Sequence, residues 1–341
     1  MKVAVYYSQK DIHIEERPIP KIGEDEALVE MKACGLCGSD LMEWYLERRS
    51  PLVLGHEPSG TIAGKGSKVK GFEAGDRVFV HHHVADLTCH YCKHGNYTLC
   101  EQFHKTNIDP GGFSEYFKVP TPNLKLDTLR LPETVSFEEA TFIEPVGCCI
   151  RALNKCNIQK DDNVAVIGAG ATGAIHVALS KIYGASKTFV SDLFDYRLKI
   201  ARKFGADVAV NPKDEDLSGI VQAETGGIGV DAAIVTAPSL EAYKSALGIC
   251  RKGGKLLVFA PTAPNKYLQV SPKELFFNEV QIIPSYSTSH VETRIALELI
   301  ASKRLRVKDL ITHKFDLIDT AKAFRTALED KDSLKVIVTN E

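Results

Sequence analysis

One thiol, one imidazole and one carboxylate stand close together near the start of this 341-residue chain. Cys37 ends an Ala-Cys-Gly-Leu-Cys segment, and His56 and Glu57 are adjacent in Leu-Gly-His-Glu. Zinc accepts this mixed ligand set when it keeps one position open for chemistry. Beside the thiol, Ser39 could carry a proton and Asp40 could orient a ligand. The pattern predicts a catalytic metal site, although each residue alone could be purely structural.

Three further cysteines crowd into a second segment. Cys89 and Cys92 form a C-x-x-C pair, and Cys100 follows closely, which is typical of a closed tetrahedral zinc site. An acid and two histidines compete as the fourth ligand: Asp86, His90 and His94. A reduced, metal-free loop is the alternative. The histidine run at 81–83 follows a predicted strand, so its side chains should face different directions, and we exclude it from the metal set.

A glycine-rich turn in the middle of the chain predicts a dinucleotide site. Gly168, Gly170 and Gly173 give the pattern G-x-G-x-x-G between a predicted strand and a helix, and Asp192 follows at the end of the next strand. The free N–H groups of the helix would face the pyrophosphate. Asp192 should bind the ribose hydroxyls and repel a 2′-phosphate, which favours NAD over NADP. Arg197 is expected near the adenosine, where it could soften that preference.

Composition excludes several classes of protein. The net charge of −2 implies no general attraction to nucleic acid or to anionic membranes. Nine cysteines, an odd number, argue against a disulfide framework. The first residues look like a strand and lack the apolar core of a signal peptide, so we expect a cytoplasmic protein without a membrane partner.

The pattern of predicted strands and helices changes along the chain. Residues 1–155 read as a β-rich region with glycine turns and long loops, and residues 156–286 alternate strands with helices. This alternation predicts a doubly wound parallel sheet in an α/β protein. Residues 287–341 again combine predicted helices and strands without this regular alternation. We therefore expect residues 156–286 to form a dinucleotide-binding domain of their own.

Taken together, these segments resemble the zinc-containing medium-chain alcohol dehydrogenases, in particular the polyol (sorbitol-type), threonine and sugar-alcohol-phosphate dehydrogenases. The resemblance rests on several motifs: 35–40, 55–57, 75–78, the cysteine loop, 111–116, Glu144-Pro145 and 168–173. It implies a GroES-like β-rich catalytic domain made from residues 1–155 and 287–341, with the Rossmann NAD-binding domain, residues 156–286, inserted between them.

By this resemblance, Cys37 and His56 ligate the catalytic zinc. Glu57 or Glu144 completes the shell, directly or through water, and Ser39 passes the substrate proton outward. Where many relatives carry a further relay histidine, this chain has Met42, so the proton exit path cannot be carried over.

Glu144 is also a candidate metal ligand for a reason that does not depend on the resemblance. It lies in Phe-Ile-Glu-Pro, where Pro145 should rigidify a turn. Apolar residues precede this carboxylate, so its burial would cost free energy unless a cation compensated its charge.

The predicted function is a zinc-dependent oxidoreductase that moves hydride between NAD(H) and a secondary alcohol, with one catalytic and one structural zinc ion. The substrate should be a small polyol, sugar or sugar derivative. Alternatives are a threonine-type or sugar-phosphate dehydrogenase, or a non-catalytic NAD- and zinc-binding protein. The resemblance also implies a homodimer or homotetramer that associates through the edge strand of the inserted domain.

Overall fold

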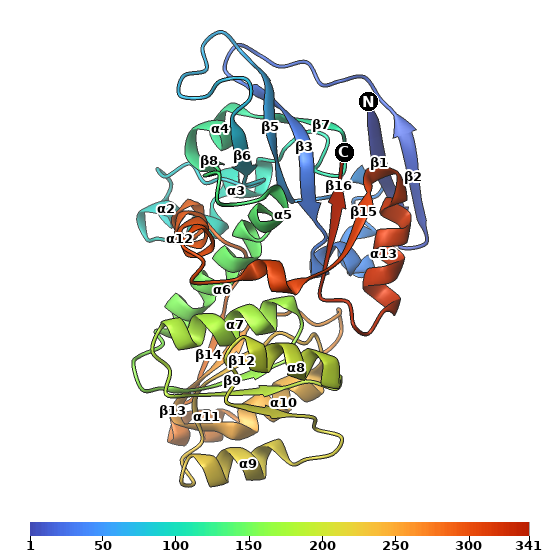
Figure 1. Cartoon of the computed structure of the whole chain (residues 1–341). Coiled ribbons are helices and arrows are strands. Elements are labelled where there is room, and N and C mark those ends of the chain that lie inside the picture. Colours follow the sequence, from blue (N-terminus) through green and yellow to red (C-terminus); the bar gives the residue numbers. More distant parts are fainter. Residues whose placement is uncertain (341) are drawn as a thin grey trace. The chain divides into compact units, whose positions relative to one another are not determined.

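The two ends of the chain fold together, and the middle of the chain folds separately (Figure 1). The computed structural model describes residues 1–340. Unit 1 combines residues 1–147 with the segment from residue 288 onward, and unit 2 comprises residues 148–287. Unit 1 contains two sheets and unit 2 contains one, and each unit has its own buried apolar core.

Unit 1 is built mainly from antiparallel strands. Its strands are β1 (Lys2–Ser8), β2 (Asp11–Glu16), β3 (Ala27–Gly35), β4 (Leu52–Val53), β5 (Glu57–Lys65), β6 (Arg77–Val80), β7 (Tyr116–Val119), β8 (Thr128–Arg130), β15 (Ile311–Asp316) and β16 (Lys335–Thr339). The larger sheet runs β15-β16-β3-β5-β6-β8, with β7 also paired to β3, and a smaller sheet runs β2-β1-β4. The C-terminal strand β16 therefore lies beside β3, which comes from the start of the chain.

Short helices occupy the connections of unit 1. They are η1 (Gly38–Leu41), α1 (Glu43–Leu46), α2 (His90–Lys93), η2 (Tyr97–Leu99), α3 (Glu101–Lys105), α4 (Thr121–Asp127), α5 (Phe137–Ala140), α12 (His290–Ala301), η3 (Val307–Leu310), η4 (Leu317–Asp319) and α13 (Thr320–Glu329). Helix α6 (Ile143–Cys156) runs from unit 1 into unit 2. The predicted turn at Glu144-Pro145 is wrong, because proline is tolerated in the first turn of a helix and both residues begin α6.

Unit 2 confirms the predicted doubly wound parallel sheet. Its strands are β9 (Asn163–Ile167), β10 (Lys187–Ser191), β11 (Val208–Val210), β12 (Val230–Val235), β13 (Cys250–Val258) and β14 (Gln281–Pro284), in the order β11-β10-β9-β12-β13-β14. All five pairings are parallel. Its helices are α7 (Ala171–Ile182), α8 (Asp195–Lys203), α9 (Leu217–Glu224), α10 (Leu240–Ile249) and α11 (Pro272–Asn278). Helices α7 and α8 lie on one side of the sheet, and α9 and α10 on the other (Figure 1).

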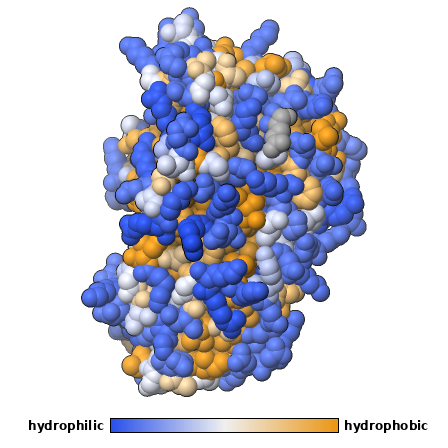
Figure 2. Space-filling view, in the orientation of Figure 1, coloured by the Kyte–Doolittle hydropathy of each residue, from blue (hydrophilic) through white to orange (hydrophobic). Residues whose placement is uncertain are grey.

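Hydrophilic residues cover most of the face seen in Figure 2, with hydrophobic residues gathered in smaller areas. Among residues 1–340, no helix is long and apolar enough to cross a membrane.

Candidate active site

Strand pairing brings the three predicted metal ligands together. Strands β3 and β5 are antiparallel, with Gly35 opposite Glu57, so the residues after β3 meet the residues at the start of β5. One ligand atom each from Cys37, His56 and Glu57 lies within 4.8 Å of the others. This spacing and the mixture of sulfur, nitrogen and oxygen donors fit a zinc ion.

Two glycines make this convergence possible. A Cβ atom on Gly35 would lie 2.0 Å from a carboxylate oxygen of Glu57, so any side chain there would displace the acid. Gly55 turns the chain with a φ of +91°, which L-residues rarely adopt, immediately before His56. The backbone therefore allows the histidine and the acid to enter one site.

Asp40 organises two of the three residues. Its Oδ1 lies 3.3 Å from Nδ1 of His56, and its Oδ2 accepts a hydrogen bond from the Cys37 backbone N–H at 3.0 Å. Holding one ring nitrogen of His56 leaves the other available as a ligand. Burial alone would lower the pKa of His56, but Asp40 and Cys37 raise that pKa well above its usual value. The surroundings of the imidazole thus favour positive charge.

Glu57 is fully buried, and only one of its two carboxylate oxygens has a hydrogen-bond partner among the described residues. Its Oε2 accepts a hydrogen bond from Nζ of Lys335, a buried residue at the start of β16. Its Oε1 is buried and has no hydrogen-bond partner within residues 1–340. Burial raises the pKa of Glu57, although the Lys335 ammonium opposes this shift. An unpaired carboxylate oxygen in a dry site is suited to a cation.

Glu144 and Ser39 lie outside the cluster formed by Cys37, His56 and Glu57. Glu144 is buried in the first turn of α6, but it supplies no atom to either candidate metal cluster of the described chain. Its charge still raises the pKa of Glu57, so it lies within electrostatic range. Ser39 is half-buried in η1, next to Asp40, and its carbonyl accepts a hydrogen bond from the Met42 N–H at 3.2 Å.

The cysteine loop forms a second cluster. Ligand atoms of Asp86, Cys89, Cys92 and Cys100 lie within 4.8 Å of one another. Oδ1 of Asp86 accepts hydrogen bonds from the N–H groups of Thr88 and Cys89, at 2.7 and 2.8 Å, which hold the pKa of that carboxyl far below its usual range. The arrangement fits a tetrahedral zinc site, and the competing histidines at 90 and 94 are outside the cluster of described residues.

The histidine run contributes to the surroundings of the first cluster, which we did not predict. The His82 ring lies 4.9 Å from the His56 ring, centroid to centroid, and His82 is 8% exposed. Burial and the neighbouring histidines lower the pKa of His82 well below its usual value, which favours the neutral ring. His81 is fully buried and pairs through Nδ1 with Asp127 at 2.8 Å. The position of the run at the end of β6, beside β5, was the available signal.

The glycine turn of unit 2 is shaped to receive a dinucleotide. Gly168 has a φ of +108°, and a Cβ on Gly173 would lie 2.0 Å from the Gly168 carbonyl oxygen. A Cβ on Gly170 would meet no heavy atom of the described chain within 4 Å, so the backbone is open to a ligand. Asp192 is fixed nearby, because its Oδ2 accepts a hydrogen bond from the Ala169 N–H at 2.7 Å. These residues fit the pyrophosphate and ribose of a nicotinamide cofactor.

Comparison with known proteins agrees with this geometry. Residues 23–128 match the family "Alcohol dehydrogenase GroES-like domain", and residues 171–302 match the family "Zinc-binding dehydrogenase". The chain is 35% identical to a sorbitol dehydrogenase of Bacillus subtilis (strain 168), with 99% of this chain and 97% of the relative covered. It is 32% identical to the sorbitol dehydrogenase of Gallus gallus, with 94% and 92% covered.

Solved structures show the same architecture. A zinc-binding dehydrogenase from Sinorhizobium meliloti 1021, bound to NADP, has a TM-score of 0.88 and 26% sequence identity, with 99% of this chain and 98% of that chain covered. The chain belongs to the zinc-containing medium-chain alcohol dehydrogenase family. The predicted family and fold class are thereby confirmed, and the protein is an oxidoreductase of alcohols that uses zinc and NAD(P).

Proposed function

We propose that this enzyme oxidises a secondary hydroxyl of a polyol, sugar or sugar derivative, and reduces the corresponding ketone, with NAD(H) as the preferred cofactor. The observation that carries the proposal is the convergence of Cys37, His56 and Glu57 in a buried site. The substrate class is supported by the two sorbitol dehydrogenases that cover nearly all of the chain.

Each residue near the cluster has a distinct task in the proposed reaction. Cys37, His56 and Glu57 would hold the catalytic zinc, and Asp40 fixes the His56 ring through Nδ1. Bound zinc supplies Lewis acidity to the substrate oxygen, and bound NAD supplies the hydride acceptor. The Ser39 hydroxyl accepts the substrate proton and passes it outward. Met42 has no proton to exchange, so it takes no part in this relay.

The preference for NAD rests on Asp192. Its carboxylate stands at the carboxyl end of β10 and is held by two backbone N–H groups, those of Ala169 and Phe194. A carboxylate in this position accepts hydrogen bonds from ribose hydroxyls and repels a 2′-phosphate.

The decisive experiment is a substrate panel with zinc-loaded protein. Linear polyols, cyclic polyols, sugar phosphates, L-threonine and simple secondary alcohols are each offered with NAD, and NADH formation is followed by absorbance. We expect turnover of polyols that is abolished when a chelator removes the zinc. Turnover confined to L-threonine or to phosphorylated substrates would overturn the substrate class, and the absence of turnover on every alcohol would overturn the proposal.

For the assembly, we propose a homodimer formed through β14. This strand is an edge of the unit 2 sheet, with a neighbour on one side only in the described chain, and Ile282 on it is 37% exposed. On the preceding helix α11, Phe276 and Phe277 are 75% and 70% exposed. An edge strand beside exposed aromatic rings is a surface that a second copy would cover.

Light scattering tests the dimer. The wild-type protein should have the mass of two chains, and the variant Phe277→Lys combined with Ile282→Lys should have the mass of one. Monomeric wild-type protein at micromolar concentration would refute this assembly.

A further inference from the structure

A pair of exposed histidines borders the cysteine loop without entering its cluster. His90 begins the short helix α2 directly after Cys89, and His94 follows the last residue of that helix. Both histidines are exposed, whereas Cys92 on the same turn is buried. The turn therefore presents Cys92 to the interior of unit 1 and both imidazoles to solvent.

The two imidazoles lie side by side. Residues four apart on a helical turn are neighbours, and the ring centroids of His90 and His94 are 4.4 Å apart, with an angle of 40° between the ring planes. Zinc binds an imidazole nitrogen at about 2.0–2.1 Å, so two rings on one ion have centroids about 4.5–5 Å apart. The observed separation is close to this value, so small rotations of the exposed rings would bring both onto one ion.

A backbone hydrogen bond fixes which nitrogen of His94 is available. Its Nδ1 lies 2.8 Å from the carbonyl oxygen of His90, and a carbonyl can only accept, so Nδ1 carries the proton and donates it. The lone pair is then on Nε2, which is the atom that a metal ion would bind. Histidine ligands are commonly held in this way, by a carbonyl or carboxylate on the nitrogen that does not bind the metal.

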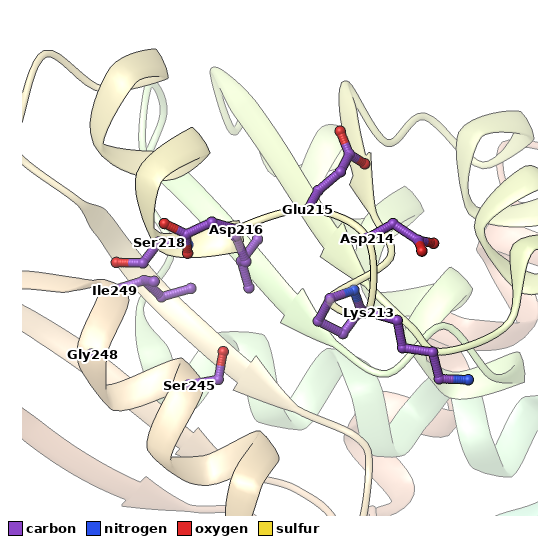
Figure 3. Close-up of a pocket in the computed structure, with 10 residues that line it drawn as sticks. Lys213, Asp214, Glu215, Asp216, Ser218, Ser245, Gly248 and Ile249 are labelled. Carbon is purple, nitrogen blue, oxygen red and sulfur yellow. The ribbon is translucent and has the colours of Figure 1, made fainter.

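The acidic pocket of unit 2 does not offer a comparable site. This pocket, of about 540 Å³, is lined by Asp214, Glu215 and Asp216 among other residues. Figure 3 shows the three carboxylates pointing in different directions, and Oδ1 of Asp216 already accepts a hydrogen bond from the Ser218 N–H at 3.0 Å. These acids form no metal cluster among the described residues. A cation that prefers nitrogen ligands should therefore bind the histidines and not this pocket.

We propose that His90 and His94 form a third metal site, in which Nε2 of His94 and a ring nitrogen of His90 chelate a divalent cation such as Zn²⁺ or Ni²⁺. The site is independent of the proposed catalytic zinc and dinucleotide sites. Imidazole ligands suit zinc, nickel and copper, whereas Mg²⁺ and Ca²⁺ prefer oxygen. Two protein ligands leave the other positions to water, so the ion exchanges with the solution and is removed by desalting, unlike the ion of the cysteine loop.

Calorimetric titration with Ni²⁺ tests the site on zinc-loaded, desalted, full-length protein, in which the thiolates of the cysteine loop are already occupied. We expect one further ion to bind to each chain. His90→Gln or His94→Gln should weaken this binding by about 10-fold or more, because one of the two protein ligands is lost, and the double variant should abolish it. Zn²⁺ should compete with Ni²⁺, and an excess of Mg²⁺ should not.

His104→Gln is the matched control. His104 is an exposed histidine on α3 of the same unit, outside the pair. Its replacement should leave the affinity for Ni²⁺ unchanged. Equal weakening in His94→Gln and His104→Gln, or the absence of a further ion in the wild-type protein, would overturn the third site.

Zinc content separates the third site from the other proposed sites. Both single variants should keep the catalytic and structural zinc ions and the wild-type melting temperature, because His90 and His94 lie outside both clusters of described residues. If His94→Gln lost the zinc of the cysteine loop, His94 would be the fourth ligand of that loop and the third site would be refuted. If Ni²⁺ bound as expected but the wild-type protein turned over no alcohol, the proposed function would fail and the third site would stand.

Discussion

The ammonium of Lys335 forms a buried ion pair with the carboxylate of Glu57, although 278 residues separate them in the sequence. Lys335 also donates to the Leu36 carbonyl at 3.3 Å, so it ties the ends of β3 and β5 to β16. One lysine thus links these three strands and pairs with one oxygen of Glu57, a proposed zinc ligand.

Removing this lysine should destabilise the metal-free protein. Lys335→Met leaves Glu57 buried without its counter-ion, which costs about 3–5 kcal/mol when only one partner of a buried pair is lost. Urea unfolding of chelator-treated protein measures the effect. The double variant Glu57→Gln with Lys335→Met should recover most of the stability, because neither charge is then buried alone. Equal losses in the single and double variants would contradict this account.

Zinc retention should distinguish the two acidic candidates. Because Glu57 and not Glu144 lies in the described cluster, Glu57→Gln should weaken catalytic zinc binding by about 10-fold or more, and Glu144→Gln should weaken it less. Competition with a chromogenic chelator gives both affinities. The opposite order would assign the ligand role to Glu144.

Ser39→Ala should slow proton transfer without loss of metal. General acid–base groups contribute typically 10²–10⁴-fold, so we expect kcat to fall by roughly 100-fold at neutral pH. Zinc content and melting temperature should match the wild type. Ser67→Ala, at an exposed serine of the same unit, is the control and should be fully active. An unchanged kcat in Ser39→Ala would remove the serine from the proton path.

Asp86→Ala should empty the cysteine loop of zinc. Elemental analysis should find about one zinc ion per chain instead of two, because the tetrahedral set loses its oxygen ligand. The thiols of the loop should then react faster with a disulfide reagent. Glu101→Ala changes a nearby exposed acid outside the cluster and should keep both ions. Two ions retained in Asp86→Ala would show that another group is the ligand.

His176 should make the protein sensitive to acid. It is fully buried, and neither ring nitrogen has a hydrogen-bond partner among residues 1–340; burial lowers its pKa to about 3. The unfolded chain therefore binds one more proton between pH 3 and about 6.5, so stability falls with decreasing pH by up to about 1.4 kcal/mol per unit.

Calorimetry of His176→Leu at several pH values checks this expectation. The variant should be more stable than the wild type by about 1–3 kcal/mol at pH 7.5, because no polar atom is buried unpaired, and its stability should fall less steeply in acid. His13→Leu, an exposed histidine, is the control. A destabilised His176→Leu would show that the ring has a stabilising role.

Sequence alone located the features that depend on local order. The glycine turn lies between β9 and α7, and unit 2 alternates strands with helices as predicted, because residue periodicity and glycine spacing act over short distances. The two clusters also combine residues that were named from their types and spacing. These assignments needed no knowledge of tertiary contacts.

The contacts that the sequence did not predict depend on the register between strands that are distant in the sequence. The pairing of Lys335 with Glu57 follows from β16 lying beside β3, which no local pattern reveals. The place of His82 against His56 depends on where β6 ends relative to β5. The turn expected at Pro145 failed because proline is compatible both with a turn and with the first residues of a helix.

Unit 1 is formed by both ends of the chain, so its two parts are synthesised at different times. Glu57 is made early, but its partner Lys335 follows 278 residues later, which takes roughly 15–55 s at ribosomal speeds of about 5–20 residues per second. Unit 2 is continuous and can fold on the ribosome during that interval. Until β16 emerges, Lys335 is not available to pair with Glu57.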